Sequence, residues 1–105
     1  GMIARTWRGA VRAEDADAYV EYLEETGLSE YRATPGNQGV YGLRRIDGDR
    51  CEFLLVTLWD DMDAVRAFAG DDPETAVFYP EDDRYLVDRD LVSNHYEVVA
   101  APEQG

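Results

Sequence analysis

The segment from Cys51 to Asp60, which reads CEFLLVTLWD, constrains the fold more than any other part of this chain. It is mostly apolar, with aromatic and β-branched side chains, and ends in a tryptophan just before the start of a helix. Side chains alternate between the two faces of a strand, and here apolar residues occupy both sets of positions. We therefore expect a strand that is covered on both faces. In a chain of 105 residues, helices can cover one face and a second copy of the chain can cover the other.

Periodicity, turn residues and helix caps divide the rest of the chain into strands and helices. The first half is expected to contain a strand at Ile3–Val11, a helix from Glu14 that ends at Gly27, a short turn at 28–33, and a strand at Gly39–Ile46. After a hairpin turn at 47–49, we expect a strand at Cys51–Trp59 and a helix at Met62–Ala69, which is capped by Asp60 or Asp61 and ended by Gly70. A short helix at Pro73–Phe78, an ambiguous stretch at 81–90 and a last strand at Leu91–Val99 complete the chain.

The order β-α-β-β-α-β predicts an α+β fold of the ferredoxin-like type. Right-handed crossovers and short loops then favour a four-stranded antiparallel sheet with helices on one face. We expect a single domain over residues 2–99, followed by a flexible tail at 100–105. Gly1, which precedes Met2, is interpreted as the remnant of a cleaved tag.

The two faces of the third strand carry different apolar sets. One face holds Phe53, Leu55 and Trp59, and the other holds Leu54, Val56 and Leu58. One set meets the helices, whereas leaving the other in water forgoes about 1.5–3 kcal/mol for each large side chain. Packing two sheets face to face recovers most of this free energy, so the pattern predicts a homodimer.

The charge balance excludes several classes of partner. Ten basic and 23 acidic residues give a net charge of −13, which disfavours nucleic acid and anionic membrane surfaces. No apolar run is long enough to span a membrane. A lone cysteine, Cys51, cannot form an intramolecular disulfide and is typical of a reducing compartment. We expect a cytoplasmic protein.

Several features together resemble the antibiotic biosynthesis monooxygenase-like proteins, which are dimeric α+β barrels. These features are the strand order, Pro35-Gly36 after the first helix, Trp59-Asp60 at the end of the third strand, and the closing segment 95–99, which reads HYEVV. The resemblance covers residues 2–99. It implies a cleft between sheet and helices, and it is more specific for fold than for function.

The family contains two chemistries, and the resemblance favours one of them. The cofactor-free branch oxidises polycyclic phenols with molecular oxygen, in a cleft lined by a tryptophan that Trp59 matches. The haem-degrading branch also needs an asparagine on the first strand and a histidine on the second long helix. Residues 3–12 contain no asparagine and residues 62–69 no histidine. Haem degradation is therefore not expected, and no cofactor is predicted.

Three residues are the candidate catalytic groups: Trp59, His95 and Arg5. Trp59 can stack on a planar ligand, or it can simply belong to the core. His95 is the one histidine, and it can accept a phenolic proton or play a structural role. Arg5 can stabilise an oxyanion or bind a carboxylate, or it can pair with one of the many acids.

Aromatic side chains are the candidate substrate-binding residues, since a flat ligand suits an aromatic lining. They are Trp7, Tyr41, Phe68, Phe78 and Tyr79, with core packing as the alternative for Phe68. The acidic clusters at 60–63, 71–72 and 81–83 lack the spacing of a calcium loop and are better explained by helix capping and a charged surface. No metal site is predicted.

Two functions remain open. The first is a cofactor-independent monooxygenase that converts a small aromatic or polycyclic substrate to a quinone in the sheet–helix cleft. The second is a dimeric module that binds a small hydrophobic or aromatic ligand, or assists another enzyme, without catalysis. The small number of acid–base groups favours the second, and Trp59 with the family resemblance favours the first.

Overall fold

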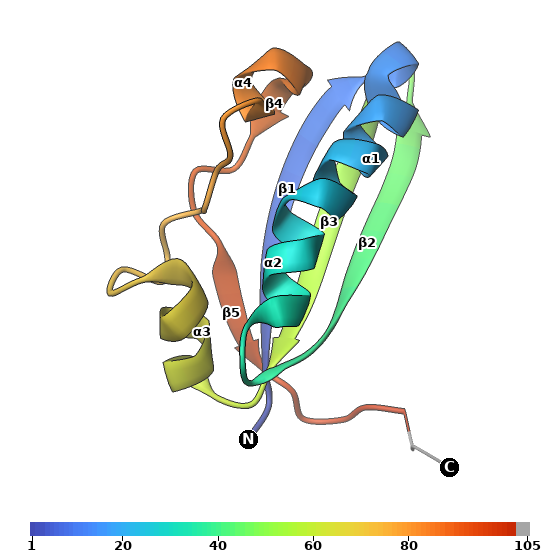
Figure 1. The fold of residues 1–105 in the computed structure, drawn as a ribbon. Helices are drawn as coiled ribbons and strands as arrows, with labels where there is room; N and C mark the ends of the chain where they lie inside the picture. Colours follow the sequence, from blue (N-terminus) through green and yellow to red (C-terminus); the bar gives the residue numbers. More distant parts are fainter. Residues whose placement is uncertain (103–105) are drawn as a thin grey trace.

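The computed structural model describes residues 1–102, in which one antiparallel sheet is covered by helices on one face only (Figure 1). Part of the expected tail, residues 103–105, lies outside this range. In the order β2-β3-β1-β4, with β5 also paired to β1, the strands are β1 (Ile3–Arg12), β2 (Asn37–Asp47), β3 (Arg50–Trp59), β4 (Leu86–Arg89) and β5 (Asn94–Glu97). The ferredoxin-like prediction is confirmed for the single chain.

The last strand of the predicted fold is divided into two pieces. β5 pairs with one end of β1 at 3–6, and β4 pairs with the other end at 9–11, where a bulge between Ala10 and Val11 interrupts the pairing. The prediction of one strand over Leu91–Val99 is therefore wrong in extent. The reason is that residues 91–93 leave the sheet to pair with 74–76, through Ala76 N–H to the Leu91 carbonyl (3.0 Å) and Ser93 N–H to the Glu74 carbonyl (2.7 Å).

The first helical region breaks at Thr26 rather than at Gly27. A 3₁₀ turn η1 (Ala13–Asp15) leads into α1 (Ala16–Glu25), and α2 (Gly27–Ala33) follows directly. Thr26 adopts φ −117° and ψ −96°, and its hydroxyl donates to the Tyr22 carbonyl at 2.7 Å. Because Thr26 makes the break, Gly27 opens the second helix instead of ending the first.

The second helical region confirms one predicted helix and corrects another. α3 (Met62–Ala69) is capped by Asp61, whose Oδ1 accepts from Ala64 N–H at 2.9 Å, and it ends at Gly70, where φ is +89°. The expected helix at Pro73–Phe78 is absent from the described chain. This segment turns at 73–74 and then pairs with the 91–93 loop, and a short helix α4 (Asp82–Tyr85) follows.

The pairing register separates the side chains of β3 into two sets, as the alternation predicted. Cys51, Phe53, Leu55, Thr57 and Trp59 are all buried beneath the helices. The even-numbered residues point to the other side, which no helix among residues 1–102 covers (Figure 1). We call this side the open face. Its apolar residues are Leu54, Val56 and Leu58 of β3, Tyr41 and Leu43 of β2, and Tyr96 of β5.

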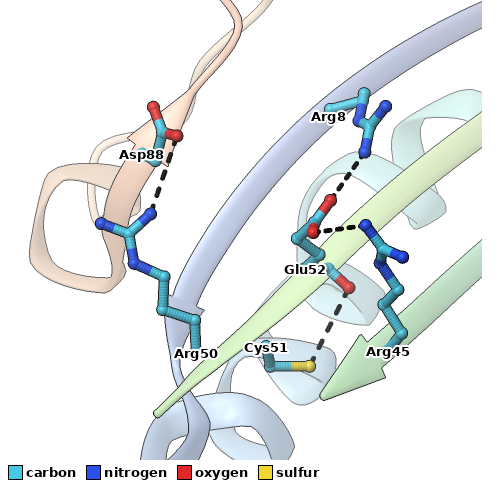
Figure 2. A network of polar contacts seen from close by, with 6 residues as sticks. All are labelled: Arg8, Arg45, Arg50, Cys51, Glu52 and Asp88. Carbon is cyan, nitrogen blue, oxygen red and sulfur yellow. Dashed lines mark hydrogen bonds and ion pairs between the residues drawn. The ribbon is translucent and has the colours of Figure 1, made fainter. Parts of the chain in front are cut away.

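Ion pairs form at one end of the open face (Figure 2). Glu52 accepts from Arg8 at 2.6 Å and from Arg45 at 2.8 Å, so one carboxylate joins three strands. The Nη1 of Arg50 in β3 lies 3.8 Å from the Oδ2 of Asp88 in β4. The apolar residues therefore have a charged border at the hairpin end of the sheet.

None of the helices in residues 1–102 combines the length and the apolar character needed to cross a bilayer.

Candidate functional site

A small cavity lies between the covered face of the sheet and the helices. Its walls include Arg5 and Trp7 of β1, Tyr19 of α1, Tyr31 of α2, and Tyr79 from the segment before α4. The space accessible to the centre of a water molecule is about 20 Å³, which is room for about one water. In this state the site is formed but nearly closed.

Arg5 is a buried cation without a carboxylate partner among residues 1–102. The residue is 5% exposed, and its Nη1 and Nη2 donate to the carbonyls of Pro73 (3.2 Å) and Thr75 (3.3 Å). Its guanidinium carbon lies 5.7 Å from the centre of the Phe68 ring. Burial lowers the pKa of Arg5, while the phenols of Tyr31 and Tyr79 oppose this shift. A guanidinium stays charged at neutral pH, so the cavity wall carries a positive charge that no carboxylate contacts directly, although Asp82 lines the same cavity.

Three tyrosines present phenolic groups at this cavity. The Tyr19 hydroxyl donates to Asp82 at 3.2 Å and the Tyr79 hydroxyl donates to Glu30 at 2.6 Å. The Tyr31 hydroxyl has no hydrogen-bond partner within the described chain. Burial raises the pKa of Tyr31 to about 12, and it also raises the pKa of Tyr19 and Tyr79. All three phenols are therefore protonated at neutral pH, and within the described chain Tyr31 is the one whose hydroxyl hydrogen is not already donated.

Asp82 is a site residue that the sequence did not reveal. The structure buries it to 5% exposure, where it accepts from the Tyr19 hydroxyl and from the Tyr79 backbone N–H at 2.6 Å. Burial raises the pKa of this carboxyl. The assignment of the 81–83 cluster to a charged surface is therefore wrong for Asp82. Nothing in the run Glu81-Asp82-Asp83 distinguishes the middle residue, since the contact with α1 is tertiary.

Comparisons with known proteins identify the fold. No protein-family model matches the sequence, and no curated protein is a significant match. Among solved structures, a proposed antibiotic biosynthesis monooxygenase from Bacillus cereus matches with a TM-score of 0.68 at 16% identity, covering 98% of each chain. The chain has the fold of this protein. SnoaB, a cofactor-independent oxygenase from Streptomyces nogalater, matches with a TM-score of 0.64 at 19% identity, covering 97% of this chain and 98% of that one.

A third match widens the range of chemistry found on this fold. MhuD, a heme-degrader from Mycobacterium tuberculosis whose structure holds two hemes in its active site, matches with a TM-score of 0.64 at 18% identity. The match covers 98% of this chain and 100% of that one. At these identities the likeness concerns the fold alone, so the chemistry must be argued from the residues of this oxygenase-like fold.

Trp59 and Phe68 lie behind the cavity rather than at its surface. Trp59 is fully buried, and its Nε1–H donates to the Thr57 hydroxyl at 2.8 Å. Its ring stacks on Phe68 at 5.6 Å between ring centres, and Tyr31 packs edge-on against Phe68 at 4.7 Å. Trp59 thus supports Phe68, which contacts the guanidinium of Arg5.

His95 lies directly opposite Arg5, on β5. Its Nε2 is buried without a hydrogen-bond partner in the described chain. Burial lowers the pKa of His95, and the charge of Arg5 lowers it further, so the neutral imidazole is favoured. His95 borders a separate, shallow groove, and Ser93 is shared by this groove and the cavity. The structure therefore places His95 beside the cavity and not within its wall.

The remaining aromatic candidates are divided between the two faces. Trp7 and Tyr79 line the cavity, and the Trp7 Nε1–H donates to the Asp90 carbonyl at 2.8 Å. Phe78 packs edge-on against Trp7 at 6.2 Å, with Arg89 at 4.7 Å from its ring centre. Phe78 thus packs behind Trp7 rather than at the cavity surface.

Tyr41 is the candidate that the structure contradicts. It pairs with Val56, lies on the open face and is 57% exposed. The pairing of β2 with β3 is continuous from the hairpin to Gly39, so Tyr41 shares the face of Val56. A bulge lies farther along β2, between Asn37 and Gly39, and does not change this pairing. The Asn37 side chain holds the bulge, because its Oδ1 accepts from Gly39 N–H at 3.0 Å and its Nδ2 donates to the Leu58 carbonyl at 3.2 Å.

The acidic clusters do not assemble a metal centre within residues 1–102, where no group of three potential ligands converges.

Proposed function

We propose that this chain is a cofactor-independent monooxygenase that oxidises a small aromatic or polycyclic phenol to a quinone. The observation that carries the proposal is the buried guanidinium of Arg5, which faces an aromatic-walled cavity without a carboxylate partner among the described residues. Deprotonated phenols are the electron-rich species that react with oxygen, and a buried cation stabilises such an anion. The likeness to SnoaB in fold supports the same chemistry.

The roles follow from the positions of the side chains. His95, held as a neutral imidazole, accepts the phenolic proton once the site opens toward Ser93. Arg5 holds the resulting anion, with Phe68 and Trp59 keeping the guanidinium in place. The anion reduces O₂. One oxygen atom stays in the product, and the other leaves as water with two hydrogens from the substrate, so the balance needs no further reductant.

A second candidate function is binding of a small aromatic ligand without catalysis. The specific observation in its favour is that His95, the proposed base, borders the groove and not the cavity wall. The cavity of about 20 Å³ must also enlarge before any aromatic ring can enter. In this case a ligand would bind and remain unchanged.

Haem degradation does not fit this chain. Residues 3–12 lack an asparagine and α3 lacks a histidine, and the one histidine lies on β5 beside a buried arginine. We expect no specific Soret shift when haem is added.

We also propose that the chain forms a homodimer through the open face. Tyr41 and Tyr96 are each 57% exposed and Leu43 is 47% exposed, and together with the β3 residues Leu54, Val56 and Leu58 they form a broad apolar surface on a small protein. Such patches mark protein contacts. The resemblance to the antibiotic biosynthesis monooxygenase-like proteins, which are dimeric α+β barrels, supports a barrel made of two sheets. Light scattering should give a mass of twice 11.9 kDa.

Turnover decides between the two functions. The purified protein, with chelator present, should consume oxygen and form quinone when given anthrone or a hydroquinone, and His95→Ala and Arg5→Gln should each lower the rate by about 10²-fold or more. The variant Arg66→Gln, on the exposed side of α3, is the matched control. Binding without oxygen uptake across a broad panel of phenols would favour the ligand-binding function.

A further inference from the structure

Arg5 has hydrogen-bond partners of an unusual kind for a buried cation. A charged group taken out of water is normally paired with an opposite charge. The partners of Arg5 are two neutral backbone carbonyls, at 3.2 and 3.3 Å, and both belong to the short segment Pro73–Thr75. These bonds use two of the five guanidinium donors, and an ionised partner would bind more strongly.

Residues 73–76, which we call the cover, lie beside the cavity, and the next residue, Val77, lines it. Residues 74–76 pair with 91–93 through the Ser93–Glu74 and Ala76–Leu91 backbone bonds, and Ser93 separates the cavity from the outer groove. Arg5 therefore attaches the sheet to the cover. In the closed state, which has room for about one water, the Arg5 guanidinium donates to two carbonyls. An anion would compete with these carbonyls for the same donors.

We infer that Arg5 is a receptor for a carboxylate, and that an aromatic carboxylate opens the cavity by displacing the carbonyls of Pro73 and Thr75 from the guanidinium. This inference rests on the proposed function, because it names the substrate class of the same site. A planar carboxylate matches the guanidinium fork with two parallel hydrogen bonds. The Tyr31 hydroxyl, which lines the cavity without a partner in the described chain, can donate to the same anion.

The surroundings select against other anions. The walls are the flat rings of Trp7, Tyr19, Tyr31 and Tyr79, which suit an aromatic body. The protein carries a net charge of −13, and Asp82 lines the same cavity. Both oppose the approach of a doubly charged phosphate more than that of a single carboxylate. Arg5 is the one cation in the cavity wall.

Calorimetric titration with 1-naphthoate and its neutral isostere 1-naphthamide tests the class of ligand. The wild-type protein should bind 1-naphthoate at least about tenfold more tightly. Arg5→Gln should lose this preference, whereas Arg66→Gln, which removes the same charge from the surface of α3, should keep it. Tyr31→Phe should weaken 1-naphthoate by several-fold and 1-naphthamide less, because an ionised acceptor forms the stronger hydrogen bond. Equal affinity for acid and amide in the wild type, or tighter binding of phenyl phosphate, would overturn the assignment.

Hydrogen exchange tests the opening. The amides of Ala76 and Ser93, which bridge the cover and the 91–93 loop, should exchange faster with 1-naphthoate bound and unchanged with 1-naphthamide. Unchanged or slower exchange would refute the displacement of the cover, even if Arg5→Gln fails to fold.

The two proposals can fail separately. Naphthoate binding without oxygen uptake on any phenol or phenolic acid would leave the carboxylate receptor standing and remove the monooxygenase. The opposite result would be oxidation of neutral anthrone that naphthoate does not inhibit, together with equal affinity for the acid and the amide. It would leave the monooxygenase standing and remove the carboxylate receptor.

Discussion

The two faces of β3 show how one strand supports two different kinds of surface. The covered face brings Thr57, Trp59 and the neighbouring Arg5 of β1 into a buried layer, where polar groups find partners within the layer or remain unpaired. The open face carries Leu54, Val56 and Leu58, with ion pairs confined to one end. Burial thus changes the energetics of charged groups on one face and leaves apolar groups without cover on the other.

This difference locates the two proposed activities. A cation without a counter-ion is costly only where water is excluded, so the buried face is where a ligand can gain most from charge. Apolar side chains gain free energy only by losing water, so the open face is where a second copy gains most. The following predictions test each side against the other, from the largest expected effect to the smallest.

Two adjacent leucines give the sharpest test of the comparison. Leu55→Ala, on the covered face at 3% exposure, should lower the free energy of unfolding by about 2–5 kcal/mol. Leu54→Ala, on the open face, should cost clearly less in dilute solution. Urea unfolding at several protein concentrations measures both. The loss of unfolding free energy in Leu54→Ala should grow with protein concentration, because dimerisation then contributes to stability. The loss in Leu55→Ala should not depend on protein concentration. Equal costs at every concentration would contradict the separation of the faces.

A charge placed on the open face should break the proposed dimer. Val56→Glu would bury an unpaired carboxylate between two sheets, so the dimer Kd should rise at least about 100-fold, or about 2.8 kcal/mol. The fold should remain, because Val56 does not contact the helices. Light scattering across a dilution series measures this shift, with Ala67→Glu on the exposed side of α3 as control. A dimer that persists in Val56→Glu would place the interface on another surface.

A pair of glycines tests how closely the covered face is packed. A Cβ added at Gly9 would overlap the Trp7 ring and approach Leu86, whereas one at Gly42 would meet Leu55 at an ordinary 3.8 Å. Gly9→Ala should therefore cost about 1–3 kcal/mol and shift Trp7, which lines the cavity. Gly42→Ala should be close to neutral. Thermal unfolding and Trp fluorescence measure both variants. If Gly9→Ala had the stability of the wild type, Trp7 would be able to move aside at no cost in free energy.

The smallest expected effects are pH dependences of opposite sign on the two faces. Burial raises the pKa of Asp82, so its favourable contribution is present below about pH 4 and is lost as the pH rises through the folded-state pKa. Asp82→Asn should therefore gain stability relative to the wild type as the pH rises from 4 to 8. An amide can still bond to the Tyr19 hydroxyl and accept from Tyr79 N–H.

On the open face, hydrogen bonds from Arg8 and Arg45 lower the pKa of Glu52. Its contribution is therefore present above the unfolded-state pKa and is lost as the pH falls through the folded-state value. Glu52→Gln should be less stable than the wild type near pH 7, and the difference should vanish at low pH. Urea midpoints at several pH values measure both variants. Shifts of the same sign would contradict the electrostatic contrast between the faces.

Local pattern was sufficient to predict most of the elements. Alternation predicted that β3 has two different apolar faces, and the expected cap at Asp60 or Asp61 and the expected end at Gly70 agree with α3, which Asp61 caps. It failed where tertiary contacts override local preference. Pro73–Phe78 has a proper helix start, but its backbone pairs with the 91–93 loop. Tyr41 was expected at the cavity as an aromatic residue, but its pairing with Val56 places it on the open face.

The candidate site was predictable in composition and less so in geometry. Arg5 and Trp7 were named from their residue type and strand position, and Tyr79 as an aromatic residue near the cleft, and all three line the cavity. Tyr19, Tyr31 and Asp82 were not, because an amphipathic helix buries tyrosines for packing as readily as for binding. The proposed roles of Trp59 and His95 in chemistry stay predictions, with Trp59 behind the cavity and His95 beside it.

The sequence by itself determined the antiparallel sheet and the apolar character of both faces of β3. These properties follow from alternation and capping, which act between residues close together in the chain. Only the tertiary structure decided that Arg5 would be buried without a carboxylate, that Asp82 would meet Tyr19, and that Tyr41 would turn away. Charge pairing and bulges depend on which distant segments meet, and that information is spread over the whole chain.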